Sequence, residues 1–179
     1  GVGFYSAFNN QDFQSIAIGS NTAYTNQSYN SIALGSYSGH TNQRHDSVAI
    51  GSYAGYTEQS YNSIAIGYYA GNTNQKENSI AIGTSSLSNT VNSIAIGTSS
   101  DASGANAIAI GLSSDANAAN TIALGKSTKA NSVNAIAIGT SANADDPNSI
   151  ALGVQSEALQ TDAIAIGKSS NAAQVNSIS

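Results

Sequence analysis

Side chains that could carry out chemistry are few in this sequence, and their placement argues against catalysis. The two histidines, His40 and His45, stand five residues apart, and one acidic residue, Asp46, follows them. A zinc site needs three or four protein ligands, and no further acidic or sulfur-containing side chain recurs around this pair. Other repeats place Tyr or Phe where these histidines stand, so we interpret both as members of aromatic columns.

The serine-rich and acidic segments give no stronger sign of an active site. The segment GTSSDASG, at 97–104, is rich in Gly and Ser like a phosphate-binding loop, but no helical pattern follows it. Asp101 and Asp115 hold the same position in successive repeats, where we expect exposure to solvent. A paired acid–base site would need one of these carboxyls to be buried. The sequence therefore predicts no enzymatic activity, no metal and no cofactor.

Composition excludes several further classes of function. The chain has 179 residues, no Cys, and only 8% charged residues, with a net charge of −5 spread thinly along it. Disulfides and thiolate metal sites are therefore absent, and charge-driven binding to nucleic acid is not expected. No apolar run is long enough to span a bilayer. The chain starts inside a repeat and without Met, so we interpret it as part of a longer protein.

One six-residue phrase, of the form NSIAIG at 62–67, recurs along the whole chain. The Gly that closes the phrase recurs with a 16-residue period up to Gly83 and with a 14-residue period from there onward. Regular self-similarity at such a period is typical of solenoid proteins. No linker separates the two periods, so we expect one domain over 1–179, with wide Tyr-rich coils at 1–83 and 14-residue coils at 84–179.

The alternation inside the phrase predicts one short β-strand per repeat. Ile and Ala alternate with a period of two, and Gly follows where a tight turn is needed. Strands that repeat in a fixed register stack as a parallel sheet, so the fold class is all-β, a parallel β-solenoid with one coil per repeat. We expect the Ile residues to fill the coil, namely Ile16, Ile18, Ile64, Ile66, Ile80, Ile82, Ile108, Ile110, Ile136 and Ile138.

If the Ile residues point inward, the Ala between them faces outward. A long uncharged stripe of Ala is unusual for a solvated strand face, which normally carries charged or larger polar groups. The alternation therefore predicts that copies of the chain associate along this stripe, about an axis parallel to the stack of coils. The interface candidates are Ala17, Ala33, Ala49, Ala65, Ala81, Ala95, Ala109, Ala123, Ala137, Ala151 and Ala165.

The remaining columns predict the rest of each coil. In the 16-residue repeat we expect a second strand near 52–55 and a turn at 57–60, and in the 14-residue repeat we expect Ser100 and Ala102 to point inward. Asn, or Asp or Gln, stands two residues before the first Ile of each phrase, where it suits a corner and a stacked amide ladder. A second amide ladder is predicted for Gln11, Gln27, Gln43, Gln59 and Gln75.

Aromatic residues gather in the 16-residue repeats and fall into three columns. Stacked rings could stabilise a wider coil, or they could present an exposed surface that binds a glycan or a protein. The two interpretations can hold together. The ligand-binding candidates in these columns are Tyr24, Tyr29, Tyr37, Tyr53, Tyr56, Tyr61 and Tyr69.

The phrase N-S-I/V-A-I/L-G, repeated with Ser and Ala in the return segment, resembles the YadA-like head of trimeric autotransporter adhesins. The resemblance covers essentially the whole chain, although the 16-residue coils depart from the 14-residue coils usual in that family. It implies a left-handed β-roll in a homotrimer, with the small-residue face toward the threefold axis. It also implies display beyond the outer membrane as the head of a longer membrane-anchored protein.

The resemblance implies a non-enzymatic adhesin that binds host matrix proteins, a glycan or host-cell receptor, or other adhesin heads. No nucleic acid is expected as a partner, and the head itself does not cross a membrane. Two alternatives come from other classes of protein. One is a structural or receptor-binding segment of a phage or viral fibre, and the other is an ice-binding β-solenoid, although Thr84, Thr98 and Thr140 are too scattered to form the usual threonine array.

Overall fold

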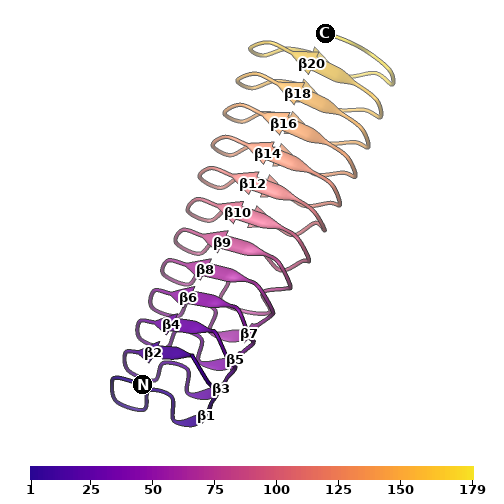
Figure 1. Ribbon diagram of the computed structural model, residues 1–179. Coiled ribbons are helices and arrows are strands. Elements are labelled where there is room, and N and C mark those ends of the chain that lie inside the picture. The colour runs from indigo at the N-terminus through magenta and orange to yellow at the C-terminus, as the bar shows by residue number, and fades with distance from the viewer. The chain divides into compact units, whose positions relative to one another are not determined.

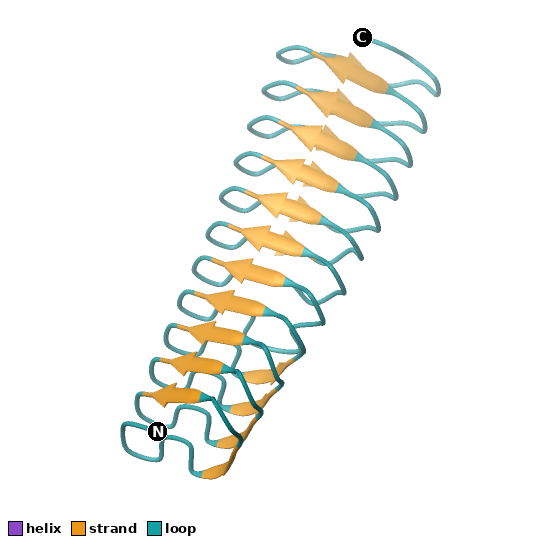
Figure 2. Cartoon of the chain, viewed as in Figure 1, coloured by secondary structure: helices purple, strands orange, loops and turns teal.

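The computed structural model describes residues 1–179 and consists of strands and connecting loops, without a helix (Figure 2). No helix with the length and apolar character required to cross a lipid bilayer occurs in it. The chain divides into two compact units, Gly1–Asn92 and Ser93–Ser179. The first unit contains the 16-residue coils, and the second contains 14-residue coils. Each unit is a stack of coils.

In the first unit, two parallel sheets form two walls of the stack (Figure 1). One sheet consists of β2 (Ile16–Ile18), β4 (Ile32–Leu34), β6 (Val48–Ile50), β8 (Ile64–Ile66) and β9 (Ile80–Ile82). The other consists of β1 (Asn9–Gln11), β3 (Thr25–Gln27), β5 (Thr41–Gln43) and β7 (Thr57–Gln59).

In the second unit, the longer strands again form one sheet and two-residue strands form the opposite wall. The longer strands are β10 (Ile94–Ile96), β12 (Ile108–Ile110), β14 (Ile122–Leu124), β16 (Ile136–Ile138), β18 (Ile150–Leu152) and β20 (Ile164–Ile166). The short strands are β11 (Asp101–Ala102), β13 (Asp115–Ala116), β15 (Lys129–Ala130), β17 (Asn143–Ala144), β19 (Glu157–Ala158) and β21 (Asn171–Ala172).

Every residue of the phrase lies beside its own counterpart in the next coil. In the pairing of β12 with β14, Ile108 stands beside Ile122 and Ala109 beside Ala123. The same parallel register holds between β2 and β4 in the first unit, where Ala17 stands beside Ala33. The prediction of an all-β parallel solenoid with one coil per repeat is confirmed.

The prediction of which face points inward is wrong. The Ala residues are 0–1% exposed, whereas Ile18, Ile110 and Ile138 are each about two-fifths exposed. The Ala residues placed at an interface are therefore core residues, namely Ala17, Ala33, Ala49, Ala65, Ala81, Ala95, Ala109, Ala123, Ala137, Ala151 and Ala165. The residues assigned to the core are half-buried or exposed on the outer face, namely Ile16, Ile18, Ile64, Ile66, Ile80, Ile82, Ile108, Ile110, Ile136 and Ile138.

The thinness of the coil explains this arrangement. In the second unit the inward side chains of both walls are almost all Ala, Ser or Thr, and sixteen Ala residues form one buried cluster. Two walls of a short coil approach so closely that methyl groups alone fill the space, and a branched four-carbon side chain would have no room. Ser100 and Ala102 are both fully buried, as predicted for the return segment.

The 16-residue coil is organised differently from the predicted one. Residues 52–55 form a turn and Thr57–Gln59 form the second strand, the reverse of the expected order. Sequence patterning fails here because the central residue of each such strand has a left-handed backbone, as at Asn26 with φ of 55° and Asn42 with φ of 54°. A left-handed residue bends the strand, so the alternation of side chains that marks a regular strand is lost.

Buried glutamines fill the interior of these wider coils. The Gln43 side chain crosses its own coil and donates from Nε2 to the carbonyl oxygen of Ile32 at 2.8 Å. Gln27 Nε2 donates to Gln43 Oε1 at 3.1 Å, and Gln43 Nε2 donates to Gln59 Oε1 at 3.2 Å. The predicted glutamine ladder is therefore confirmed, and it is a hydrogen-bonded core rather than a surface feature.

The corners of the coils are set by residues with positive φ. Asn106, Asn120 and Asn134 have φ of 58–61°, and their amides are linked by hydrogen bonds of 3.1 and 3.2 Å, as predicted for a corner ladder. The Gly of the phrase permits close approach of neighbouring coils. A Cβ on Gly111, whose φ is 136°, would lie 2.2 Å from the carbonyl oxygen of Gly125.

Candidate functional site

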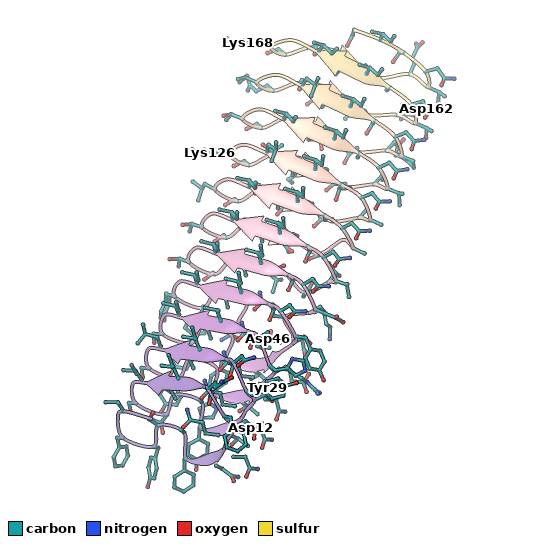
Figure 3. The ribbon with its side chains drawn as sticks, in the orientation of Figure 1. Asp12, Tyr29, Asp46, Lys126, Asp162 and Lys168 are labelled. Carbon is teal, nitrogen blue, oxygen red and sulfur yellow. The ribbon has the colours of Figure 1, made fainter.

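In each unit, the outward side chains of the longer strands form an apolar surface, and we name this surface the Ile face. It consists of the residues immediately before and after the buried Ala in β2, β4, β6, β8 and β9, and in β10, β12, β14, β16, β18 and β20. All of these residues are Ile, Leu or Val, and none carries a charge. In the second unit, Lys126 and Lys168 lie in the loops at one end of the strands, and Asp162 lies in a loop at the other (Figure 3).

Two of the aromatic columns touch each other. Tyr37, Tyr53 and Tyr69 stack with ring centroids 4.9 and 4.8 Å apart. Tyr24, His40 and Tyr56 form the second column, with centroids 5.1 and 4.8 Å apart. Tyr53 meets Tyr56 at 5.5 Å, which joins the two columns into one patch.

The third column is separate from that patch and contains Tyr29, His45 and Tyr61, with centroids 4.7 and 4.2 Å apart. Its residues stand two positions after the ends of β3, β5 and β7, so the second and third columns flank these strands. The Asn30 amide, and then His45 at 3.1 Å, hold the pKa of Asp46 below its usual value. Figure 3 shows Tyr29 and Asp46 in the first unit.

Ring faces in these columns are occupied by other rings. Tyr24 and His40 are 5° from parallel, and Tyr37 and Tyr53 are 4° from parallel. Rings that stack in this way leave their edges and hydroxyl groups for solvent, so flat stacking of a ligand is possible at column ends alone. The columns therefore stabilise the wider coil, and a role of the seven tyrosines in binding a ligand stays a prediction.

The histidines behave as members of the columns, as predicted. His40 stacks on Tyr24 and Tyr56, and its burial lowers the pKa of its imidazole below the usual value. His45 stacks on Tyr29. No group of three or more His, Cys, Asp or Glu side chains converges in a way that could hold a metal ion.

The two aspartates expected to face solvent are half-buried instead. Asp101 and Asp115 stand side by side in the pairing of β11 with β13, and Lys129 follows in the next coil. Burial, followed by the charge of Asp101, raises the pKa of Asp115, and Lys129 acts in the opposite direction. Ser103 Oγ donates a hydrogen bond to Asp101 Oδ1.

Replacing Asp115 with asparagine is expected to raise the Tm at pH 7. A carboxyl whose pKa is higher in the folded state than in the unfolded state binds protons more readily when folded, so its contribution to stability falls as pH rises through the unfolded pKa of about 3.9. The gain of Asp115→Asn should therefore shrink as the pH approaches that value. Calorimetric scans between pH 3 and pH 8 measure this, and a lower Tm of the variant at pH 7 would contradict it.

One surface of the 16-residue coils was missed by the sequence reasoning. The outward-facing residues at the centre of β1, β3 and β5 form an amide ladder, in which Asn10 donates to Asn26 at 3.0 Å and Asn26 to Asn42 at 2.9 Å. A depression beside it is lined by Asn26, Asn42, Ser28 and Arg44, among others. The sequence feature that could have indicated this surface is the tripeptide Thr-Asn-Gln, which recurs with the period of these coils.

Comparison with known proteins identifies the relatives of this fold. The family model for the YadA head domain repeat matches residues 75–100, 102–128, 130–156 and 158–179, more than half of the chain. The crystal structure of the collagen-binding domain of Yersinia adhesin YadA is similar, with a TM-score of 0.63 and 33% sequence identity over 68% of this chain and 67% of that chain. No curated protein sequence matches. The chain thus belongs to the family of YadA-like head domains.

Proposed function

We propose that this chain is the head of a surface adhesin that forms a homotrimer and binds a protein of the extracellular matrix. The observation that carries the proposal is the Ile face. A solvated strand face is normally polar, and a contiguous apolar surface of this kind marks a contact with another macromolecule. The relative described as a collagen-binding domain supports the choice of a matrix protein as ligand.

Self-association accounts for the Ile face better than ligand binding does. The face is built from the same kinds of branched apolar side chain in every coil of each unit, so no coil of it is chemically distinguished as the place for a particular ligand. Identical chains that pack such faces around an axis parallel to the stack would form a closed assembly, with Ile against Ile at its centre. The family resemblance favours three chains.

Trimerisation would also explain how a chemically uniform surface binds tightly. Three copies present three equivalent outer surfaces. When these surfaces bind the same ligand at once, the overall affinity exceeds the affinity of each single surface. We propose that the matrix ligand contacts these outer surfaces, and that the head is displayed beyond the outer membrane. Binding and display need no catalysis.

Placing lysine at both Ile110 and Ile138 is expected to convert the trimer into a folded monomer. These side chains lie outside the coil, so the change removes apolar contact between chains without disturbing the Ala core. Light scattering should give three times the chain mass of 18.0 kDa for the natural chain and the chain mass itself for the variant. Circular dichroism should show the same strand signal for both.

Thr140→Lys is the matched control, because Lys126 and Lys168 naturally occupy the same position of other coils. It should remain trimeric. Binding to immobilised collagen should weaken at least about tenfold in the double lysine variant and stay unchanged in the control. A natural chain that is a stable monomer at every concentration would refute the proposed trimer. A trimer that binds no matrix protein would refute the proposed ligand and leave the proposed trimer standing.

A further inference from the structure

We propose that the 16-residue coils bind an extended, uncharged polysaccharide chain in a groove that runs along the stack of coils. We name this surface the amide groove. One of its walls is formed by Asn10, Asn26 and Asn42, and the other by Ser28, Arg44 and Ser60. The inference goes beyond binding of a matrix protein and does not depend on the trimer.

The groove consists of three depressions that follow one another over several coils and share lining residues. Its central section lies between Asn26 and Asn42 on one side and Ser28 and Arg44 on the other, and it has a volume of about 270 Å³. The section toward the N-terminus shares Asn26 and Ser28 with it, and the section toward the C-terminus shares Asn42 and Arg44. A long ligand can therefore lie along the groove and meet one coil after another.

The amide ladder does not use all the hydrogen-bond donors and acceptors of its Asn side chains. Each Asn amide carries two N–H donors and an oxygen with two lone pairs, and the ladder uses one donor of Asn26 and one lone pair of its oxygen. One donor and one acceptor per coil remain for a ligand. A sugar hydroxyl both donates and accepts a hydrogen bond, so it complements such an amide more fully than a phosphate or a proline residue does, because these offer acceptors alone.

The spacing of the ladder also suits a sugar chain. Neighbouring coils stand about 4.8 Å apart, which is close to the advance of one residue in an extended chain of β-1,4-linked pyranoses. Successive sugars in such a chain alternate in orientation, but each edge of the chain carries hydroxyl groups at every residue, so every coil meets a hydroxyl. A β-strand advances about 3.3 Å per residue and falls out of step with the ladder. A polyproline II peptide returns to the same phase after about 9.3 Å, so it would meet every second coil.

The charges along the groove favour an uncharged ligand. Asp12 and Glu58 line its outer sections, and they are balanced by Arg44 and Lys76. Because the signs alternate along the stack, an anionic polymer such as a nucleic acid or a sulfated glycan gains no net attraction.

The walls of the groove are held in place before a ligand arrives. Asn26 and Asn42 have left-handed backbones, which fix the direction of their side chains, and the buried glutamine ladder lies directly behind them. Arg44 donates from Nη1 to the Tyr61 hydroxyl at 3.0 Å, and its guanidinium lies 5.3 Å from the centre of that ring. A preformed site loses less conformational entropy on binding.

Calorimetric titration of the complete chain with cellohexaose and with chitohexaose tests the proposal. We expect at least one hexasaccharide to bind with a Kd of about 1 mM or tighter. The double change Asn26→Gly with Asn42→Gly should weaken this binding at least about tenfold, because glycine keeps the left-handed backbone but removes the amide. Circular dichroism and the Tm confirm that the variant is folded.

Asn120→Gly is the matched control, since Asn120 belongs to a similar ladder at a left-handed corner of the 14-residue coils. Its affinity for the hexasaccharide should equal that of the natural chain. The proposal is overturned if neither hexasaccharide binds at millimolar concentration, or if the double glycine variant binds as well as the natural chain. Displacement of the sugar by a decaproline peptide, with the peptide binding more tightly, would overturn it in favour of a protein ligand.

Discussion

Replacing Ala109 with leucine is expected to destabilise the unit of 14-residue coils by about 3 kcal/mol. Ala109 is fully buried, stands beside Ala95 and Ala123 in the sheet, and belongs to the cluster of methyl groups between the two walls. Three added carbons have no space there, so the coil must widen and break hydrogen bonds to both neighbouring coils. Chemical denaturation measures the loss of stability.

Ile110→Leu is the control, because Leu124 and Leu152 already occupy the same position of other coils. It adds no volume and changes a side chain on the outer face, so we expect a change of less than about 0.5 kcal/mol. The reverse result would be unchanged stability of Ala109→Leu and a large loss of stability in Ile110→Leu. It would show that Ile, and not Ala, fills the coil. The pair of variants thus tests the direction of the strand faces.

Replacing Gln43 with glutamate is expected to destabilise the 16-residue coils by about 3 kcal/mol at pH 7. Nε2 of Gln43 donates to the Ile32 carbonyl oxygen and to Gln59 Oε1, and it lies 3.4 Å from the Ser47 carbonyl oxygen. A carboxylate would bring negative charge against these acceptors in a buried position. The pKa of the new carboxyl would therefore rise well above the usual value of about 4.3.

The sign of the pH dependence follows from that shift. The folded variant would hold its proton at pH values where the unfolded chain has released it, so its stability should fall as pH rises above about 4.3. Urea denaturation at pH 4 and pH 7 measures the difference. Asn42→Asp is the control, because Asn42 lies on the outer surface and Glu58 already stands in its column. Equal pH profiles for Gln43→Glu and this control would contradict a buried ladder.

The sequence was sufficient to predict the repeat, the strand within each phrase, the parallel register and the two amide ladders. All of these depend on spacing alone, and the spacing of Gly and Asn is unambiguous. The strand faces were assigned wrongly because a period of two separates Ile from Ala without saying which one is inside. The decision rests on the distance between the walls of the coil, and a 14-residue coil leaves room for Ala109 and Ala102 but not for Ile110.

The candidate site was less predictable than the fold. The aromatic columns were visible in the sequence, but the contact between Tyr53 and Tyr56 depends on how the turn at 52–55 folds. The amide groove was not foreseen because Asn26 is a left-handed residue inside a strand, and no pattern of apolar residues marks such a position. The recurring tripeptide Thr-Asn-Gln is the sequence feature from which this groove could have been predicted.

The register of these sheets has a consequence for how such chains change in length. Ile108 meets Ile122, and Ile122 meets Ile136, so an internal coil has the same neighbours whichever coil it is. Duplication or deletion of one complete 14-residue segment, as unequal recombination between near-identical gene segments would produce, leaves every remaining contact of the same kind. A lineage carrying this fold can therefore lengthen or shorten its heads one coil at a time, whereas an insertion of a single residue within a coil would disturb the pairing of that coil with its two neighbours.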